Sequence, residues 1–166
     1  MNNILSLFKP IKHFIFDIDG VLTDGTLLIS ADGTMLRSMN IKDGYAIQLA
    51  TKKGFSVSII SGATGEAIQK RFLGLGVANV HLGIENKIQK FEEIIEERNL
   101  ELSHILYMGD DMPDLEIMKR VALPCCPSDA CPEIKGVSTY ISPLPGGKGC
   151  VRDVIEKVLK LNGAWM

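Results

Sequence analysis

Short, mostly apolar segments that alternate with helical patterns constrain this chain most. They lie at His13–Phe16, Ser56–Ile60, Ile105–Met108 and Leu123–Cys125, and each is typical of a strand buried on both faces. Strands that alternate with helices predict a parallel sheet with helices on both sides. The expected fold class is therefore α/β, a Rossmann-like three-layer arrangement around a parallel sheet.

The intervening segments have helical apolar spacing or carry helix-boundary residues. We predict a brief strand near Val80 and helices over these ranges: Asp43–Lys53, about Thr64 to Leu73, about Lys87 to Arg98, a helix opened by Pro113, and Val151–Leu161. No repeat or long linker interrupts the pattern, so residues 1–166 are interpreted as a single domain.

A β-hairpin is expected between the first strand and the first helix. Thr26–Ile29 and Met35–Met39 flank Ser30-Ala31-Asp32-Gly33, which has the composition of a tight turn. The hairpin and the following helix use most of the chain between Asp17 and Ser61. We therefore expect the hairpin to project from the sheet, and this stretch leaves no room for an additional domain.

Composition excludes several classes of partner. The net charge of −2 and the pI near 5.9 provide no long-range attraction for nucleic acid or an anionic membrane. No apolar run approaches the ~20 residues that span a bilayer, and the N-terminal residues do not resemble a secretory signal. The four cysteines lack the spacing of a zinc site or a disulfide framework, which favours a cytoplasmic protein with reduced thiols.

Acidic residues follow two of the predicted buried strands. Asp17 and Asp19 end the first, and Asp110, Asp111 and Asp114 follow the third. Each acid taken singly could cap a helix or fill a turn. However, carboxyl ends of parallel strands meet at one edge of a sheet, and close carboxylates repel each other unless they bind a cation or share a proton. Oxygen ligands favour Mg²⁺.

A hydroxyl and a lysine complete the set. Ser61-Gly62 follows the second strand, where a hydroxyl and backbone N–H groups can hold phosphate, although the pair is also an ordinary turn. Lys87 opens a predicted helix, where a cation opposes the helix dipole unless an anion lies nearby. Carboxylates, a hydroxyl, a lysine and a metal ion together favour phosphoryl transfer through an aspartyl phosphate.

These motifs resemble the haloacid dehalogenase superfamily of phosphohydrolases. Asp17-Ile18-Asp19-Gly20, Ser61, Lys87 and Gly109-Asp110-Asp111-Met112-Pro113-Asp114 occur in the order found in that family. The resemblance implies that Asp17 attacks phosphorus. It implies that Asp19 protonates the leaving alcohol and then activates water.

The resemblance also implies the binding residues. Ser61, Gly62 and Lys87 would hold the phosphate. Mg²⁺ would be bound by Asp17, by Asp19 through its backbone carbonyl and by Asp110, with Asp111 and Asp114 in supporting roles.

The hairpin, the short length and the segment Gly146–Arg152 are similar to capless members that act on phosphorylated sugar acids in lipopolysaccharide synthesis. This similarity implies hydrolysis of an octulosonate 8-phosphate and a substrate-binding role for Arg71. It also implies a homotetramer in which a neighbouring subunit closes each active site. Ala63 departs from the arginine that many such enzymes carry there, which removes a guanidinium that could bind the sugar-acid carboxylate.

Two alternatives remain open. One is the same chemistry on a nonulosonate 9-phosphate, and the other is a phospho-acceptor signalling domain, which also combines acids, a hydroxyl and a lysine. The segment Leu161–Met166 is expected to fray, or else to dock on a neighbouring subunit through Trp165.

Overall fold

A six-stranded parallel sheet forms the centre of the molecule, as expected for the predicted α/β fold. The computed structural model describes residues 4–165, and the strand order is β5-β4-β1-β6-β7-β8. In chain order the strands of this sheet are β1 (His13–Phe16), β4 (Ser56–Ile60), β5 (Asn79–His81), β6 (Ile105–Met108), β7 (Leu123–Cys126) and β8 (Tyr140–Ile141).

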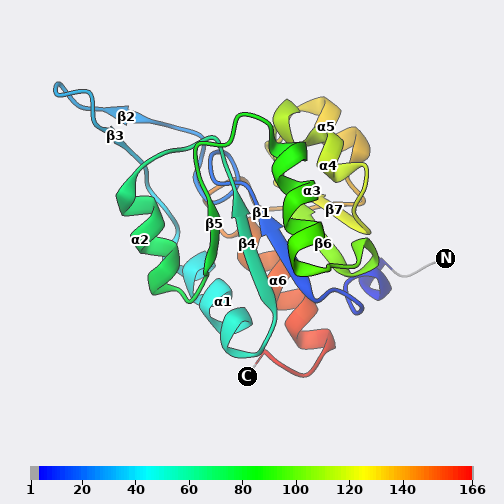
Figure 1. Cartoon of the computed structure of the whole chain (residues 1–166). Coiled ribbons are helices and arrows are strands. Elements are labelled where there is room, and N and C mark those ends of the chain that lie inside the picture. Colours follow the sequence, from blue (N-terminus) through cyan, green and yellow to red (C-terminus); the bar gives the residue numbers. More distant parts are fainter. Residues whose placement is uncertain (1–3, 166) are drawn as a thin grey trace.

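Helices cover both faces of the sheet and make the three layers (Figure 1). One face carries α1 (Ile41–Lys52), α2 (Glu66–Gly74) and α6 (Cys150–Leu161); the other carries α3 (Lys87–Arg98), α4 (Leu115–Met118) and α5 (Pro132–Val137). Three short 3₁₀ turns, η1 (Ile4–Leu7), η2 (Leu102–His104) and η3 (Met112–Asp114), complete the described chain. No helix within residues 4–165 is long and apolar enough to cross a membrane.

Alternation along β1 divides the hydrophobic core in two. Phe14 and Phe16 point into the cluster shared with α1, α2 and α6, whereas Ile15 belongs to the cluster shared with α3, α4 and α5. All three side chains are fully buried. A strand covered on both faces needs apolar residues at every position, which is why the sequence shows an uninterrupted apolar run.

The predicted hairpin is present but shorter than expected. Only β2 (Leu28–Ile29) and β3 (Met35–Leu36) pair, and the hairpin projects away from the sheet (Figure 1). No layer of the subunit lies beneath these strands, and their four apolar side chains are 50–66% exposed. A two-stranded ribbon without a supporting core has little to extend its pairing.

Several boundaries and elements differ from the prediction. Helix α2 begins at Glu66 rather than near Thr64, and the helix expected from Pro113 is split into η3 and α4. The short α5 and β8 were not predicted, because α5 is too short to show periodicity and β8 pairs only two residues with β7.

The prediction that the C-terminal segment frays is wrong for the residues up to Trp165. The Ala164 N–H donates to the Leu159 carbonyl at 2.8 Å. The Trp165 ring packs edge-on against the Tyr45 ring, with 6.3 Å between the ring centroids. The Arg152 Cζ lies 5.1 Å from the centroid of the Trp165 ring. Aromatic and cation–π contacts within the same chain therefore hold this segment on α1 and α6. Met166 lies outside the described residues.

Asp43 joins α1 to the start of α6. Its side chain is fully buried, and Oδ1 accepts a hydrogen bond from the Arg152 N–H at 2.7 Å. Its Oδ2 has no hydrogen-bond partner among the described residues. Burial raises the pKa of Asp43 to about 6, although the backbone donors of Arg152 and Gly149 oppose the rise. The carboxylate form therefore costs stability in the folded protein.

The Asp43→Asn variant tests this cost. Because the folded pKa lies above the ordinary value of 3.8, the stabilisation from Asp43 is complete only below about pH 4 and is lost as the pH rises through 6. The free energy of unfolding of the wild type, minus that of Asp43→Asn, should fall by on the order of 2 kcal/mol between pH 4.5 and 7.5. Denaturant titrations measure this difference, in which the other titrating groups cancel. A difference that is constant with pH would contradict the assignment.

Candidate active site

Residues from several sheet elements meet in one cavity at the carboxyl ends of β1, β4 and β6. The cavity has a volume of about 380 Å³. It is lined by Asp17, Asp19, Gly20, Gly25, Ser61, Gly62, Ala63, Ile84, Glu85, Lys87, Asp110, Asp111 and Pro113. The edge of the sheet that was predicted to gather an acid, a hydroxyl and a second acid does gather them.

Asp17 lies directly after β1 and is almost fully buried. Its Oδ1 accepts a hydrogen bond from the Ile18 N–H at 2.7 Å, and its Oδ2 lies 2.7 Å from Lys87 Nζ. Burial raises the pKa of Asp17 to about 6, and the negative charge of Asp114 adds to the rise, while Lys87 opposes it. The carboxylate is thus fixed in position, with donors on both oxygens.

Lys87 occupies the first position of α3, and its buried ammonium bridges two acids. The Nζ lies 2.7 Å from Asp17 and 2.8 Å from Asp114. Burial alone would lower the pKa of Lys87, but the charges and hydrogen bonds of Asp114 and Asp17 raise it above its ordinary value. Lys87 is therefore not a solvated surface lysine, and it holds a positive charge at the wall of the cavity.

Asp114 supports this arrangement from beneath. Its Oδ1 accepts from Lys87 and from the Tyr107 hydroxyl at 2.6 Å, and its Oδ2 accepts from the Asp110 N–H at 3.1 Å. Gly109 makes room for it, because a Cβ there would lie 2.4 Å from the Asp114 Cβ. Tyr107 was not singled out in the sequence, although it is the one polar side chain within β6.

Asp110 faces Asp17 across the cavity. Burial raises the pKa of Asp110 to about 7, and the charges of Asp17 and Asp114 add to this. Its Oδ1 is buried and has no hydrogen-bond partner within residues 4–165. Gly20 allows the close approach, since a Cβ on it would lie 1.9 Å from Asp110 Oδ2 and its φ is +84°.

The acids fit a divalent cation. Asp17, Asp110 and Asp114 each offer an oxygen within 4.8 Å of the others. Asp114 is fully buried and does not line the cavity, whereas Asp17 and Asp110 do, and Asp110 Oδ1 has no hydrogen-bond partner among the described residues. An all-oxygen donor set with an unpaired buried carboxylate suits Mg²⁺, so Asp17 and Asp110 are the side chains that would hold it.

Asp19 differs from Asp17 although only Ile18 separates them. Its Oδ1 lies 2.7 Å from Arg37 Nε and its Oδ2 lies 3.0 Å from Arg37 Nη2, a bidentate pair. Its carboxylate is not part of the acidic cluster, so any metal contact from Asp19 would fall to its backbone. Arg37 was missed in the sequence, where it stands as one cation in the apolar run that ends the hairpin.

Ser61 and Gly62 line the same cavity as the acids. Ser61 is buried, and its Oγ accepts a hydrogen bond from the Ala63 N–H at 3.2 Å. Gly62 is exposed. The loop continues to Gly65 before α2 starts, so Ser61 and Gly62 belong to this loop and not to the first turn of the helix.

Two predicted residues lie away from the centre. Asp111 is exposed at the rim, where its side chain accepts from the Met112 N–H at 2.8 Å. Arg71 does not line the cavity. It lines a neighbouring groove of about 460 Å³ between the hairpin and α2, which Arg37 also lines. Its guanidinium lies against Gly44, where a Cβ would come within 2.4 Å of Nη2.

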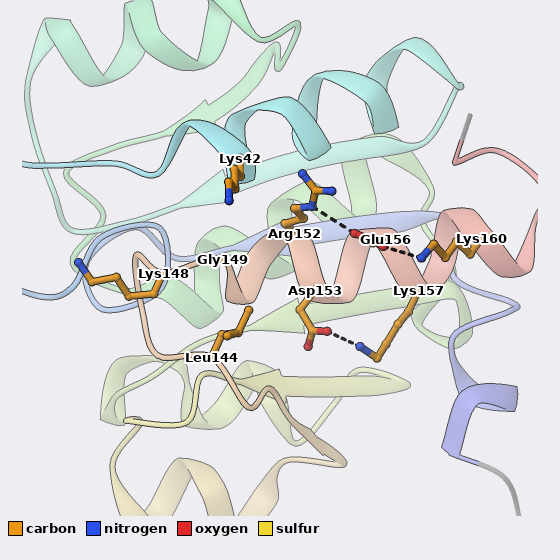
Figure 2. A pocket seen from close by; sticks show the side chains of 9 residues that line it. All are labelled: Lys42, Leu144, Lys148, Gly149, Arg152, Asp153, Glu156, Lys157 and Lys160. Carbon is orange, nitrogen blue, oxygen red and sulfur yellow. Dashed lines mark hydrogen bonds and ion pairs between the residues drawn. The ribbon is translucent and has the colours of Figure 1, made fainter.

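A larger groove of about 480 Å³ runs along α6, away from these acids (Figure 2). Asp153 pairs with Lys157, and Glu156 pairs with both Arg152 and Lys160. The acids that line this groove are thus neutralised by neighbouring cations on α6. The groove contains none of the predicted catalytic residues, so the cavity at the strand ends is the candidate active site.

Comparison with known proteins identifies the family. Residues 80–149 match a family model described as haloacid dehalogenase-like hydrolase. The 3-deoxy-D-manno-octulosonate 8-phosphate phosphatase of Escherichia coli K12 is 30% identical over 97% of this chain and 86% of its own.

Solved structures of proteins with this name have a similar fold. The 3-deoxy-D-manno-octulosonate 8-phosphate phosphatase from Moraxella catarrhalis, in complex with magnesium ion, phosphate ion and KDO molecule, has a TM-score of 0.94 and 32% identity, covering 99% of this chain and 95% of that one. The enzyme of the same name from Yersinia pestis has a TM-score of 0.94 and 27% identity, over 99% and 89% of the two chains. This chain belongs to the 3-deoxy-D-manno-octulosonate 8-phosphate phosphatase family of the haloacid dehalogenase superfamily.

Proposed function

We propose that this protein hydrolyses 3-deoxy-D-manno-octulosonate 8-phosphate to the free sugar acid and phosphate, with Mg²⁺ as cofactor. The observation that carries the proposal is the buried Asp17 carboxylate, held 2.7 Å from Lys87 and beside Asp110 at the carboxyl edge of the sheet. A nucleophilic carboxylate, a fixed cation and a cation-binding acid are what phosphoryl transfer to an aspartate requires.

The phosphate would bind between Lys87 and the Ser61–Gly62 loop. Lys87 supplies positive charge, and Ser61 Oγ and the exposed Gly62 backbone supply hydrogen-bonding groups. These groups neutralise the phosphate enough for the anionic Asp17 to approach it. Mg²⁺, when bound, neutralises charge on the transferring phosphoryl group and orients it.

The first chemical step forms a bond between an Asp17 oxygen and phosphorus and breaks the bond from phosphorus to the sugar oxygen. Asp19, which lines the same cavity, gives a proton to that leaving oxygen. In the second step the Asp19 carboxylate takes a proton from water, and the resulting hydroxide attacks phosphorus. Phosphate leaves and Asp17 is regenerated.

The presence of Asp19 two residues from the acceptor favours an enzyme over a signalling domain. A phospho-acceptor domain has to retain its aspartyl phosphate, whereas Asp19 is placed to activate the water that destroys it. The nonulosonate 9-phosphate alternative uses the same catalytic residues, so only substrate comparison separates it.

The oligomer and its location belong to the same proposal. The exposed apolar side chains of β2 and β3 favour association through the hairpin, and a homotetramer would let a neighbour close each open cavity. All four cysteines are free thiols, which suits the cytoplasm. The phosphosugar acid is the expected small-molecule partner, and neither nucleic acid nor membrane is.

The pH dependence of Mg²⁺ binding tests the metal assignment. In the metal-free protein the pKa of Asp17 is about 6 and that of Asp110 about 7, so stability from these groups is lost as the pH rises through 6 to 7. At pH 8, Mg²⁺ at a concentration of one hundred times its Kd should raise the free energy of unfolding by about 2.7 kcal/mol. The same concentration of Mg²⁺ should raise the free energy of unfolding much less at pH 5, because protons compete for the same carboxylate oxygens.

Thermal melts with and without Mg²⁺ measure this stabilisation. Asp110→Asn should abolish it, whereas Glu116→Gln, a surface acid on α4, should retain it. Equal stabilisation of wild type and Asp110→Asn would exclude Asp110 as a ligand.

A substrate panel tests the activity itself. The wild type should have its highest kcat/KM on the octulosonate 8-phosphate, above the nonulosonate 9-phosphate and simple sugar phosphates, and should need Mg²⁺. Asp17→Asn should lower kcat at least about a thousandfold because it removes the nucleophile. A stoichiometric phosphoprotein that persists for hours without turnover would instead indicate the signalling domain.

Hairpin substitutions test the oligomer. Leu28→Asp with Ile29→Asp should leave the subunit folded, because both side chains are 66% exposed, but should convert the tetramer to smaller species. Light scattering measures the mass, and Leu102→Asp, 40% exposed away from the hairpin, is the matched control. A wild type that is monomeric would refute this part of the proposal.

A further inference from the structure

The ion pair between Arg37 and Asp19 lies at the edge of the active-site cavity, which Asp19 lines. Nε and Nη2 of Arg37 hold the two carboxylate oxygens of Asp19 at 2.7 and 3.0 Å. The Arg37 side chain is only 9% exposed, although the hairpin strand that precedes it is largely exposed. A buried guanidinium at the base of a projecting hairpin is held there by this carboxylate.

The two partners of this ion pair line different cavities. Asp19 lines the active-site cavity, whereas Arg37 lines the neighbouring groove that also contains Arg71. A substrate whose phosphate lies against Lys87 extends past Asp19, since Asp19 must reach the leaving oxygen. The rest of the sugar therefore passes the Arg37–Asp19 pair on its way out of the cavity.

The paired state is not the state that catalysis needs. A bidentate guanidinium occupies both Asp19 oxygens, whereas the first step needs one of those oxygens to reach the leaving oxygen of the substrate. The pair must therefore loosen during turnover. A group that competes for Arg37 would release Asp19.

A carboxylate is the group that matches this guanidinium. Two parallel N–H donors fit carboxylate oxygens, as they already do with Asp19. Lys87 is the one cationic side chain among the residues that line the active-site cavity, and its ammonium is already bonded to Asp17 and Asp114. Ala63 adds no charge to the wall, and Arg37 is a cation in direct contact with a lining residue, Asp19.

We propose that Arg37 exchanges Asp19 for the carboxylate of the sugar-acid substrate, so that the carboxylate both anchors the sugar and releases Asp19 for proton transfer. This inference rests on the proposed function. It makes Arg37 a specificity-determining residue, because a phosphoester without a carboxylate leaves the Arg37–Asp19 pair closed.

The test compares the octulosonate 8-phosphate with its carboxamide analogue, which has the same shape but no negative charge. The wild type should prefer the carboxylate substrate in kcat/KM. Arg37→Met should reduce this preference by about tenfold or more, since it removes a charge-assisted bidentate contact, and Arg37→Lys should keep part of it. Circular dichroism and thermal melts establish that the variants fold.

Matched variants distinguish the outcomes. Arg120→Met, which removes a surface pair with Glu92, should leave the preference unchanged. If Arg37→Met lowers kcat/KM equally for both substrates, Arg37 only positions Asp19 and the inference fails. It fails too if Arg71→Met, and not Arg37→Met, removes the preference. If the wild type does not hydrolyse the sugar-acid phosphate at all, the proposed function fails instead.

Discussion

The buried ammonium of Lys87 is the interaction on which the site depends. Asp17 and Asp114 would repel each other at the sheet edge without the cation that lies 2.7 and 2.8 Å from them. One positive charge does not neutralise three carboxylates; burial raises the pKa of Asp17 to about 6 and that of Asp110 to about 7, and the charges of neighbouring carboxylates add to both rises. The remaining negative charge is what makes the cavity a place for a divalent cation.

The strands and the sheet edge could be predicted because their cause is local in the sequence. A strand covered on both faces is mostly apolar, so β1, β4 and β6 are visible as short, mostly apolar runs, and Asp17, Ser61 and Asp110 come soon after their ends. Parallel topology then brings those ends together without any knowledge of side-chain contacts. Lys87 followed from the same reasoning, since a cation at a helix start needs an anion.

Arg37, Tyr107 and the true position of Arg71 could not be predicted on these grounds. Tyr107 looks like any core aromatic until Asp114 is placed beneath it at 2.6 Å. Arg37 reaches Asp19 only because the chain between them folds out into the hairpin and returns, a path that no periodicity records. Arg71 lies against Gly44 of α1, and the direction of a long side chain depends on that packing rather than on its helix.

Two carboxylates separated by one residue thus have opposite environments. Asp17 is buried against Lys87, whereas Asp19 is partly exposed and held by a residue of the hairpin. Because Arg37 directly follows β3, any contact that orders the hairpin also orders the guanidinium that holds Asp19. An association through the exposed hairpin would therefore influence proton transfer as well as cover the cavity, which gives a physical reason for a capless phosphatase to place its exposed apolar surface on this element.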